Sequence, residues 1–558
     1  MGKQITGGRY IAETIHSLGI SHVFFMDAIL RKALVEMEEL GIRRILAHSE
    51  KAAAYMADGY ARISGKPAVC MSQSVGAANL AAGLQDAFLG QSPVIALTGR
   101  QPARMQYRNA YQELPHEPFF RALTKSSACI ELPEQLPLLL RQAFRTATTG
   151  QPGPVHLDIA GHTGDIIGSG LLTEEGLDDP HPHSHYPLYR APADSALVEK
   201  AADYIRQAQR PVLVADIGVM RSGAESALRE LANKLSIPVV ASLDAKAVMT
   251  ESEPLYAGIV GTYSSDSGNR TVDASDLVIF VGSNVGDQIT NNWRLPHKGV
   301  KTIQIYSDPA ELGRNIFDSF GLPGDPLTIL KQLTSVCQPA ERNEWVNRVQ
   351  TFVAEWRAGM DKYRSSAAVP VRPERLCKEV GSALPTNGVL VADTGYSSHW
   401  SGTLVRLEHP EQQYFRASGS LGWGFPASLG MKCARPDLPV VCFTGDGGFM
   451  YHMPELETAR RWSINTITVV NNNACLAQGA RAIEEAYRGR NGDSGEIHNF
   501  MPINFARVAE EMGCVGIRVE HGDEYADAFA TALKADAPVV IDVVTDPSAL
   551  APLPWESN

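Results

Sequence analysis

Short apolar runs alternate with amphipathic stretches along most of the chain. In its first block the apolar runs are residues 22–25, 45–47, 68–71, 94–97 and 155–159. Residues 50–63 and 77–89 lie between these runs and repeat apolar positions at helical spacing. Short apolar runs predict strands buried on both faces, and helices between them imply parallel βαβ units. Residues 1–166 therefore predict one doubly wound α/β domain.

The same pattern appears twice more. The apolar runs of these two blocks are residues 211–215, 238–241, 277–281 and 302–305, and then 388–392, 440–443, 466–470 and 539–543. A segment rich in Pro, Gly and His, 167–192, precedes the second block, and a segment at 337–373 with a helical stretch precedes the third. The predicted fold class is α/β, with three consecutive doubly wound parallel-sheet domains at 1–166, 190–336 and 371–558.

The composition of the chain argues against several classes of protein. The 558 residues carry a formal net charge of −12, which argues against nucleic acid or an acidic membrane surface as the main partner. No apolar run reaches the length of a membrane-spanning helix, and no signal-peptide pattern is visible, so we expect a cytoplasmic protein. The eight cysteines are scattered without a C-x-x-C pair, which favours reduced core thiols over a disulfide framework or a zinc site.

The strongest chemical signal begins at the end of the apolar run 440–443. Gly445, Asp446, Gly447 and Gly448 follow that run, and the next run, 466–470, leads into three asparagines that end at Asn473. Neighbouring parallel strands place such residues at one edge of the sheet, where α/β domains bind ligands. A carboxylate, an amide oxygen and a backbone carbonyl suit Mg²⁺, and the glycines allow N–H groups to approach a diphosphate. The alternative is a strand-end turn beside an asparagine-rich loop.

With these residues in place, the chain resembles the thiamine-diphosphate-dependent enzymes of the acetolactate synthase (acetohydroxyacid synthase) type. The resemblance covers nearly the whole chain, in the order pyrimidine-binding, central and diphosphate-binding domain. Its Gly-Asp-Gly…Asn-Asn motif implies thiamine diphosphate and Mg²⁺ as cofactors. By this match the metal ligands are Asp446, Asn473 and the backbone carbonyl of Cys475.

A second signature lies in the first domain, in the stretch from His48 to Arg62. It resembles the family segment that carries the cofactor-activating glutamate, which implies that Glu50 hydrogen-bonds the pyrimidine ring and assists proton removal from the thiazolium. Spacing alone would explain Glu50 as a favourable charge in the first turn of a helix.

Other positions match the family's cofactor-binding and catalytic residues. Leu421 matches the bulky apolar residue under the cofactor, and Gln112 a glutamine near the reacting centre. Two further groups match loops that contact the cofactor: Gly76 and Asn79 in the first domain, and Gly395, Ser397, Ser398 and His399 in a strand-to-helix turn of the third.

The resemblance implies an enzyme that forms or cleaves a carbon–carbon bond of a 2-oxo acid or related small-molecule carbonyl through an enamine intermediate. Glu50 and Asp446 lie in different domains, and in the family the two halves of each site come from two subunits. A homodimer or homotetramer with sites at the subunit interface is therefore expected. FAD is a further candidate cofactor of the central domain, but the loop 282–287 lacks the arginine expected there.

Two alternatives remain open. The stretch from Asn471 to Gly479 is closer to the 2-hydroxyacyl-coenzyme A lyases. A nucleotide cleft with basic residues in the central domain would favour a lyase of such thioesters or of another ketone, and Arg314 is a candidate there. The other alternative is a non-catalytic cofactor-binding regulatory protein. The joint presence of Glu50, Asp446 and Asn473 argues against it.

Overall fold

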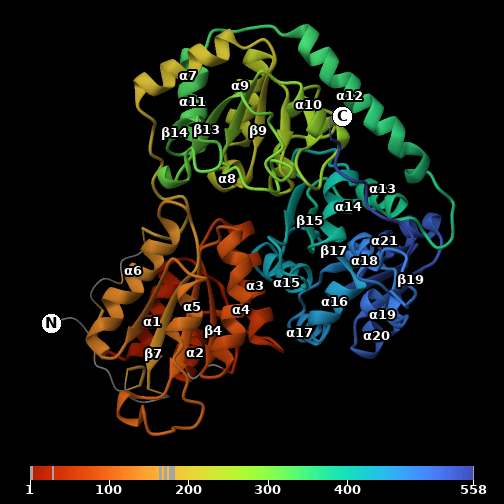
Figure 1. Ribbon diagram of the computed structural model, residues 1–558. Coiled ribbons are helices and arrows are strands. Elements are labelled where there is room, and N and C mark those ends of the chain that lie inside the picture. The colour runs from red at the N-terminus through yellow and green to blue at the C-terminus, as the bar shows by residue number, and fades with distance from the viewer. Residues whose placement is uncertain are drawn as a thin grey trace.

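Three α/β domains follow one another along the chain (Figure 1). The computed structural model describes residues 4–27, 30–161, 166–168, 172–174, 177 and 182–556. Each of the three expected domain ranges contains one six-stranded sheet in which all pairings are parallel. The predicted fold class is therefore confirmed.

The first sheet has the strand order β3-β2-β4-β5-β7-β6. Its strands are β2 (His22–Met26), β3 (Arg43–Leu46), β4 (Ala68–Gln73), β5 (Val94–Arg100), β6 (Ser126–Ile130) and β7 (Val155–Ala160). Its helices are α1 (Gly7–Ser17), α2 (Arg31–Glu39), α3 (Glu50–Ser64), α4 (Gly76–Leu89), α5 (Glu117–Arg121) and α6 (Leu136–Thr148). A short antiparallel pair, β1 (Gln4–Ile5) with β8 (Leu172–Thr173), lies outside this sheet.

The third sheet repeats the topology of the first, with the order β16-β15-β17-β18-β20-β19. Its strands are β15 (Val389–Ala392), β16 (Gln413–Arg416), β17 (Val440–Gly445), β18 (Ile467–Asn472), β19 (Val515–Val519) and β20 (Val539–Val544). Its helices are α13 (Pro373–Ala383), α14 (Tyr396–Leu404), α15 (Gly424–Ala434), α16 (Asp446–His452), α17 (Glu455–Trp462), α18 (Ala480–Tyr487), α19 (Gly495–His498), α20 (Phe505–Glu511) and α21 (Tyr525–Lys534). In both sheets the strand order reverses between the first and third strands, which creates a crevice for ligands at their carboxyl ends.

The central sheet has a different order, β11-β10-β9-β12-β13-β14. Its strands are β9 (Pro211–Ala215), β10 (Val239–Ala241), β11 (Tyr256–Ile259), β12 (Leu277–Val281), β13 (Lys301–Tyr306) and β14 (Phe320–Pro323), and its helices are α7 (Ser195–Gln207), α8 (Ile217–Ser222), α9 (Glu225–Leu235), α10 (Asp266–Asp273) and α11 (Pro326–Val336). The long helix α12 (Asn343–Arg364) covers this domain and leads into the third (Figure 1). None of the described helices combines the length and apolar character needed to cross a membrane.

Five strands of the three six-stranded sheets were not predicted from the apolar runs: β6, β11, β14, β16 and β19. All five lie at an edge of their sheet. Four of them, β6, β14, β16 and β19, are partly exposed, so their sequences lack the continuous apolar run by which the inner strands were identified. The fifth, β11, is mostly buried, but it has only four residues and contains Gly258.

Helices α3 and α15 bring the first and third domains together (Figure 1). Their backbones touch at two glycines. A Cβ atom on Gly430 would lie 1.8 Å from the backbone oxygen of Met56, and one on Gly59 would lie 2.1 Å from the backbone oxygen of Ala427. Because real Cβ atoms do not approach so closely, any larger residue at either glycine would push the two domains apart.

A buried ion cluster lies beside this helix pair. The guanidinium of Arg62 donates to both carboxylate oxygens of Asp58, at 2.8 and 2.7 Å, and to Asp86 at 2.8 Å. It also donates to the backbone oxygen of Arg416 in the third domain, at 2.8 Å. Asp86 in turn accepts the backbone N–H groups of Ser418 and Ser420, at 2.9 and 3.0 Å. The cluster therefore fixes the segment between β16 and α15 against the first domain.

Replacing Arg62 with Met should destabilise the protein strongly, because two carboxylates would remain buried without their cation. We expect the free energy of unfolding to fall by about 3–5 kcal/mol, measured from urea unfolding followed by tryptophan fluorescence. Arg121→Met is the matched control, since Arg121 forms an exposed pair with Glu117. Equal stability of the Arg62 and Arg121 variants would contradict the role of the cluster.

Candidate active site

A cleft of about 510 Å³ opens at the carboxyl ends of β15, β17 and β18, which are neighbours in the third sheet. Nine of the predicted site residues line it: Gly395, Ser397, Leu421, Gly445, Asp446, Gly447, Gly448, Asn473 and Cys475. The fold therefore gathers residues that are up to 80 positions apart in the sequence, from Gly395 to Cys475.

Asp446 is the charged group of the cleft. It begins α16 directly after β17, and its carboxylate accepts the N–H of Gly447 at 2.6 Å and that of Cys475 at 3.3 Å. Burial raises the pKa of Asp446 to about 6, although these backbone donors oppose the rise. Among the described residues no cationic side chain pairs with this carboxylate; its hydrogen-bond partners are neutral N–H groups. A cation bound in the cleft would compensate its charge.

Two asparagines add neutral oxygens beside it. The side-chain oxygen of Asn473 accepts the N–H of Cys475 at 3.1 Å. Asn471 pairs in register with Gly445, lines the cleft, and has a buried side-chain oxygen without a hydrogen-bond partner. Asn471 was not singled out from the sequence, although it stands in the same asparagine run. One carboxylate with several amide oxygens fits a hard cation that also takes oxygens from a phosphate.

Space for such a phosphate is left by glycines. Gly395 has a φ of +67°, and a Cβ there would lie 2.7 Å from the side-chain oxygen of Gln478. A Cβ on Gly447 would lie 2.7 Å from a methyl group of Leu476. Side chains at these positions would narrow the cleft, whereas glycine leaves backbone N–H groups open to an anion. The donors and the shape of the cleft thus fit a metal-bound diphosphate.

Two of the predicted residues of the third domain lie outside the cleft lining. Ser398 is buried, and its hydroxyl donates to the backbone oxygen of Asp393 at 2.6 Å. His399 is buried against the ring of Tyr263, with ring centroids 4.9 Å apart, and burial lowers its pKa to about 3. Both side chains hold α14 in place and do not reach the cavity.

The loop that carries Leu421 is fixed by a residue that the sequence did not single out. Asp393 follows β15 and is buried, and its carboxylate accepts the N–H groups of Gly422 and Gly424, both at 3.0 Å, and that of Thr394 at 2.7 Å. Burial raises the pKa of Asp393 to about 6. Asp393 of the third domain therefore positions Leu421. Asp86 of the first domain positions Ser418 and Ser420, which precede Leu421 in the same loop.

Glu50 lies in a separate cluster in the first domain. Ser49 caps α3 by accepting the N–H of Ala52 at 3.1 Å, so Glu50 begins the helix. Its carboxylate accepts the side-chain N–H of Asn79 at 3.2 Å, and a Cβ on Gly76 would lie 2.4 Å from its other oxygen. The predicted residues Glu50, Gly76 and Asn79 are thus brought together, and Gly76 leaves room for the carboxylate.

Gln112 lines another cavity in the first domain, of about 760 Å³, together with Val75, the residue before Gly76. Arg100 is the only cation among the described residues that line this cavity. It pairs with Glu131 and lies 3.3 Å from Asp158. This cavity adjoins the Glu50 cluster through Val75 and Gly76.

Comparison with known proteins gives a consistent result across the three domains. Residues 5–119 match the N-terminal binding domain, residues 198–333 the central domain, and residues 393–543 the C-terminal binding domain of thiamine pyrophosphate enzymes. A probable acetolactate synthase large subunit of Methanocaldococcus jannaschii is 31% identical, over 98% of this chain and 93% of its own length.

Two relatives from Escherichia coli are also similar. The acetolactate synthase isozyme 2 large subunit is 28% identical over 97% of this chain and 96% of its own length. A glyoxylate carboligase is 29% identical over 91% of this chain and 87% of its own length.

Replacing Asp393 with Ala should loosen the loop that carries Leu421. Hydrogen bonds to a charged acceptor contribute about 1.5–3 kcal/mol, so the amides of Gly422 and Gly424 should exchange with deuterium roughly 10- to 100-fold faster. Hydrogen exchange followed by mass spectrometry measures this, with Asp437→Ala, an exposed aspartate that pairs with Arg435, as the control. Unchanged protection in the Asp393 variant would exclude it as the residue that positions the loop.

Proposed function

The chain belongs to the thiamine pyrophosphate enzymes, and from that premise we propose that it makes or breaks a carbon–carbon bond of a 2-oxo acid with thiamine diphosphate and Mg²⁺. It is an enzyme of the acetolactate synthase and glyoxylate carboligase type. The observation that supports this reaction and these cofactors is the buried carboxylate of Asp446, which lies among amide oxygens and glycines.

In this proposal the cleft holds the diphosphate end of the cofactor. Asp446, Asn473 and the backbone carbonyl of Cys475 bind Mg²⁺, and the N–H groups around Gly395 and Gly447 face the phosphates. Leu421 supports the rings. When bound, the cofactor supplies the nucleophilic carbon and the electron sink.

Glu50 supplies the acid–base function at the other end. Its carboxylate is oriented by Asn79 and held free of side-chain crowding by Gly76. All the residues that line the cleft belong to the third domain, whereas Glu50 belongs to the first. We therefore propose that Glu50 of one subunit faces the cleft of another, in a homodimer or homotetramer.

The cavity beside Val75 supports a 2-oxo acid as substrate. Its lining is rich in amide side chains, including Gln112, which can hydrogen-bond a carbonyl oxygen. Arg100 is the cation of this lining, and a substrate carboxylate would compete for it with Glu131 at the surface and with the buried Asp158. Arg100 is thus the candidate group for selecting acids over neutral carbonyl compounds.

The thioester-lyase alternative receives no support from the residue that was named for it. Arg314 forms an exposed pair with Glu311, 2.6 Å apart, and does not line the central pocket. The two functions can be separated by incubating the protein, thiamine diphosphate and Mg²⁺ with a panel of 2-oxo acids and of 2-hydroxyacyl-coenzyme A thioesters. Consumption of a 2-oxo acid with release of carbon dioxide is expected. Cleavage of thioesters alone would contradict the proposal.

Asp446→Ala should remove the charged metal ligand and with it cofactor retention. We expect the affinity for thiamine diphosphate in the presence of Mg²⁺ to fall by at least roughly 100-fold, as measured by isothermal titration calorimetry. Asp527→Ala, at an exposed position of α21, should bind like the unmodified protein. Undiminished binding by the Asp446 variant would refute the ligand assignment.

Glu50→Gln should leave cofactor binding largely intact while slowing removal of the thiazolium proton, because the amide cannot act as the acid–base group. A decrease of roughly 10²- to 10⁴-fold in the exchange rate of that proton is expected. Proton exchange into deuterium oxide, followed by NMR after acid quench, gives the rate, with the exposed Glu117→Gln as control. An unaltered rate would remove Glu50 from the mechanism.

A further inference from the structure

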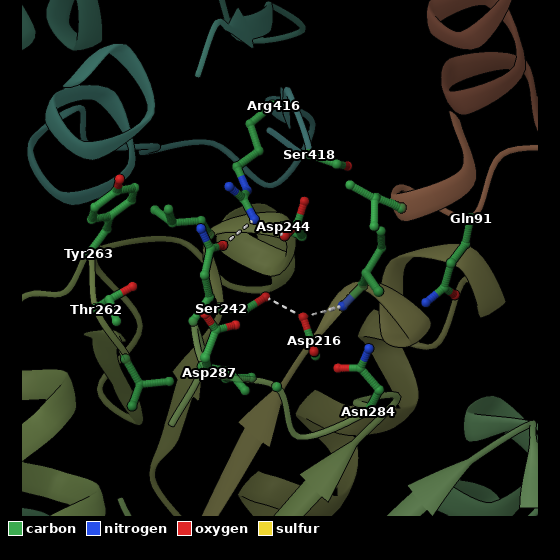
Figure 2. Close-up of a pocket in the computed structure, with 17 residues that line it drawn as sticks. Gln91, Asp216, Ser242, Asp244, Thr262, Tyr263, Asn284, Asp287, Arg416 and Ser418 are labelled. Carbon is green, nitrogen blue, oxygen red and sulfur yellow. Dashed lines mark hydrogen bonds and ion pairs between the residues drawn. The ribbon is translucent and has the colours of Figure 1, made fainter. Parts of the chain in front are cut away.

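The central domain has the strand order that in α/β proteins binds dinucleotides. Numbered within the domain, its strands lie in the order 3-2-1-4-5-6. In such sheets the dinucleotide crosses the crevice between the first and fourth strands, and its pyrophosphate lies at the N-terminus of the helix after the first strand. Here that crevice lies between β9 and β12, and a pocket of about 330 Å³ opens there (Figure 2). This volume is at the lower end of the range for drug-sized ligands.

A side chain of the protein occupies the place of the phosphate. Asp216 directly follows β9 and precedes α8. Its carboxylate accepts the N–H of Ile217 at 2.8 Å and the hydroxyl of Ser242 at 2.6 Å (Figure 2). These are the donors that a phosphate would use, and Asp216 is itself buried.

The other charges of the pocket also disfavour an anion. Asp244 and Asp287 line it together with Asp216, and Arg416 is the only cation among the described lining residues. The guanidinium of Arg416 is already bound, by Asp244 at 2.5 Å and by the side-chain oxygen of Gln288 at 2.8 Å (Figure 2). Three carboxylates and one paired guanidinium leave the lining with a net negative charge.

The raised pKa of Asp216 also indicates a pocket that disfavours anions. Burial raises it, and the nearby carboxylate of Asp244 raises it further. The pocket thus disfavours the negative charge of Asp216, and a phosphate would add further negative charge.

We infer that the central pocket excludes FAD and other phosphate-bearing nucleotides, because the carboxylate of Asp216 takes the position of their phosphate groups and Asp244 neutralises Arg416, the only arginine among the described lining residues. The residues present do not fit a flavin. The inference goes beyond the proposed function, since it concerns a pocket in another domain.

The experiment measures nucleotide binding directly, without substrate or thiamine diphosphate. The purified protein should show no flavin absorbance, and it should bind neither FAD, followed by flavin fluorescence, nor ADP, followed by calorimetry. Because it needs no turnover, this result is independent of whether the proposed reaction is found. Flavin in the purified protein, or stoichiometric binding of added FAD or ADP, would overturn the inference.

Variants of the central pocket test whether its negative charge is what excludes nucleotides. Asp216→Asn combined with Asp244→Asn keeps side chains of the same shape, removes two charges and releases Arg416, so ADP should bind at least about tenfold more tightly. Asp287→Asn, at an exposed position of the lining, tests the same point with little risk to folding and should strengthen ADP binding less. Asp308→Asn, outside the pocket, is the control and should change nothing. If both pocket variants fold and bind ADP no more tightly than the Asp308→Asn control, negative charge is not what excludes nucleotides.

Discussion

The buried cluster of Arg62, Asp58 and Asp86 is the interaction on which the site's geometry depends. One guanidinium satisfies two carboxylates inside the first domain and also reaches the backbone of the third. Since buried charges are tolerated only when paired and hydrogen-bonded, this arrangement admits one relative position of the two domains. Asp86 and Asp393 then hold the loop around Leu421 from its two sides. The contact of α3 with α15 at Gly59 and Gly430 keeps the helices close enough for the cluster to form.

The three domains share one architectural principle and differ in what they place at the crevice of the sheet. The first and third sheets have the same strand order. The third places there a carboxylate that pairs with no cation in the described part of the chain, together with amide oxygens and glycines, which leaves room for a metal and a diphosphate. The central sheet places Asp216 on the donors that a phosphate would use. The same position in a doubly wound sheet can thus be kept open for an anion or closed by a carboxylate.

The sequence predicted the inner strands of all three sheets because burial on both faces requires apolar runs. It did not predict edge strands such as β16 and β19, whose exposed positions carry polar residues. Candidate site residues could be named from the sequence where a local motif exists, as for Asp446, Asn473 and Glu50, and their roles stay predictions. Asp393, Asn471 and Asp216 were missed because their importance comes from contacts between distant segments, which no local pattern records. Ser398 and His399 stand beside cleft residues in the sequence, but helical periodicity turns them away from the cavity.

Glu50 and the Asp446 cleft lie on different domains, and in the proposed assembly two chains join them in one site. Mixing the Glu50→Gln and Asp446→Ala variants tests this most directly. In a symmetric dimer each mixed pair contains one site with both groups intact, so random 1:1 mixing should restore about a quarter of the unmodified activity from two inactive proteins. Activity that stays at the level of the separate variants after subunit exchange would contradict a site shared between chains.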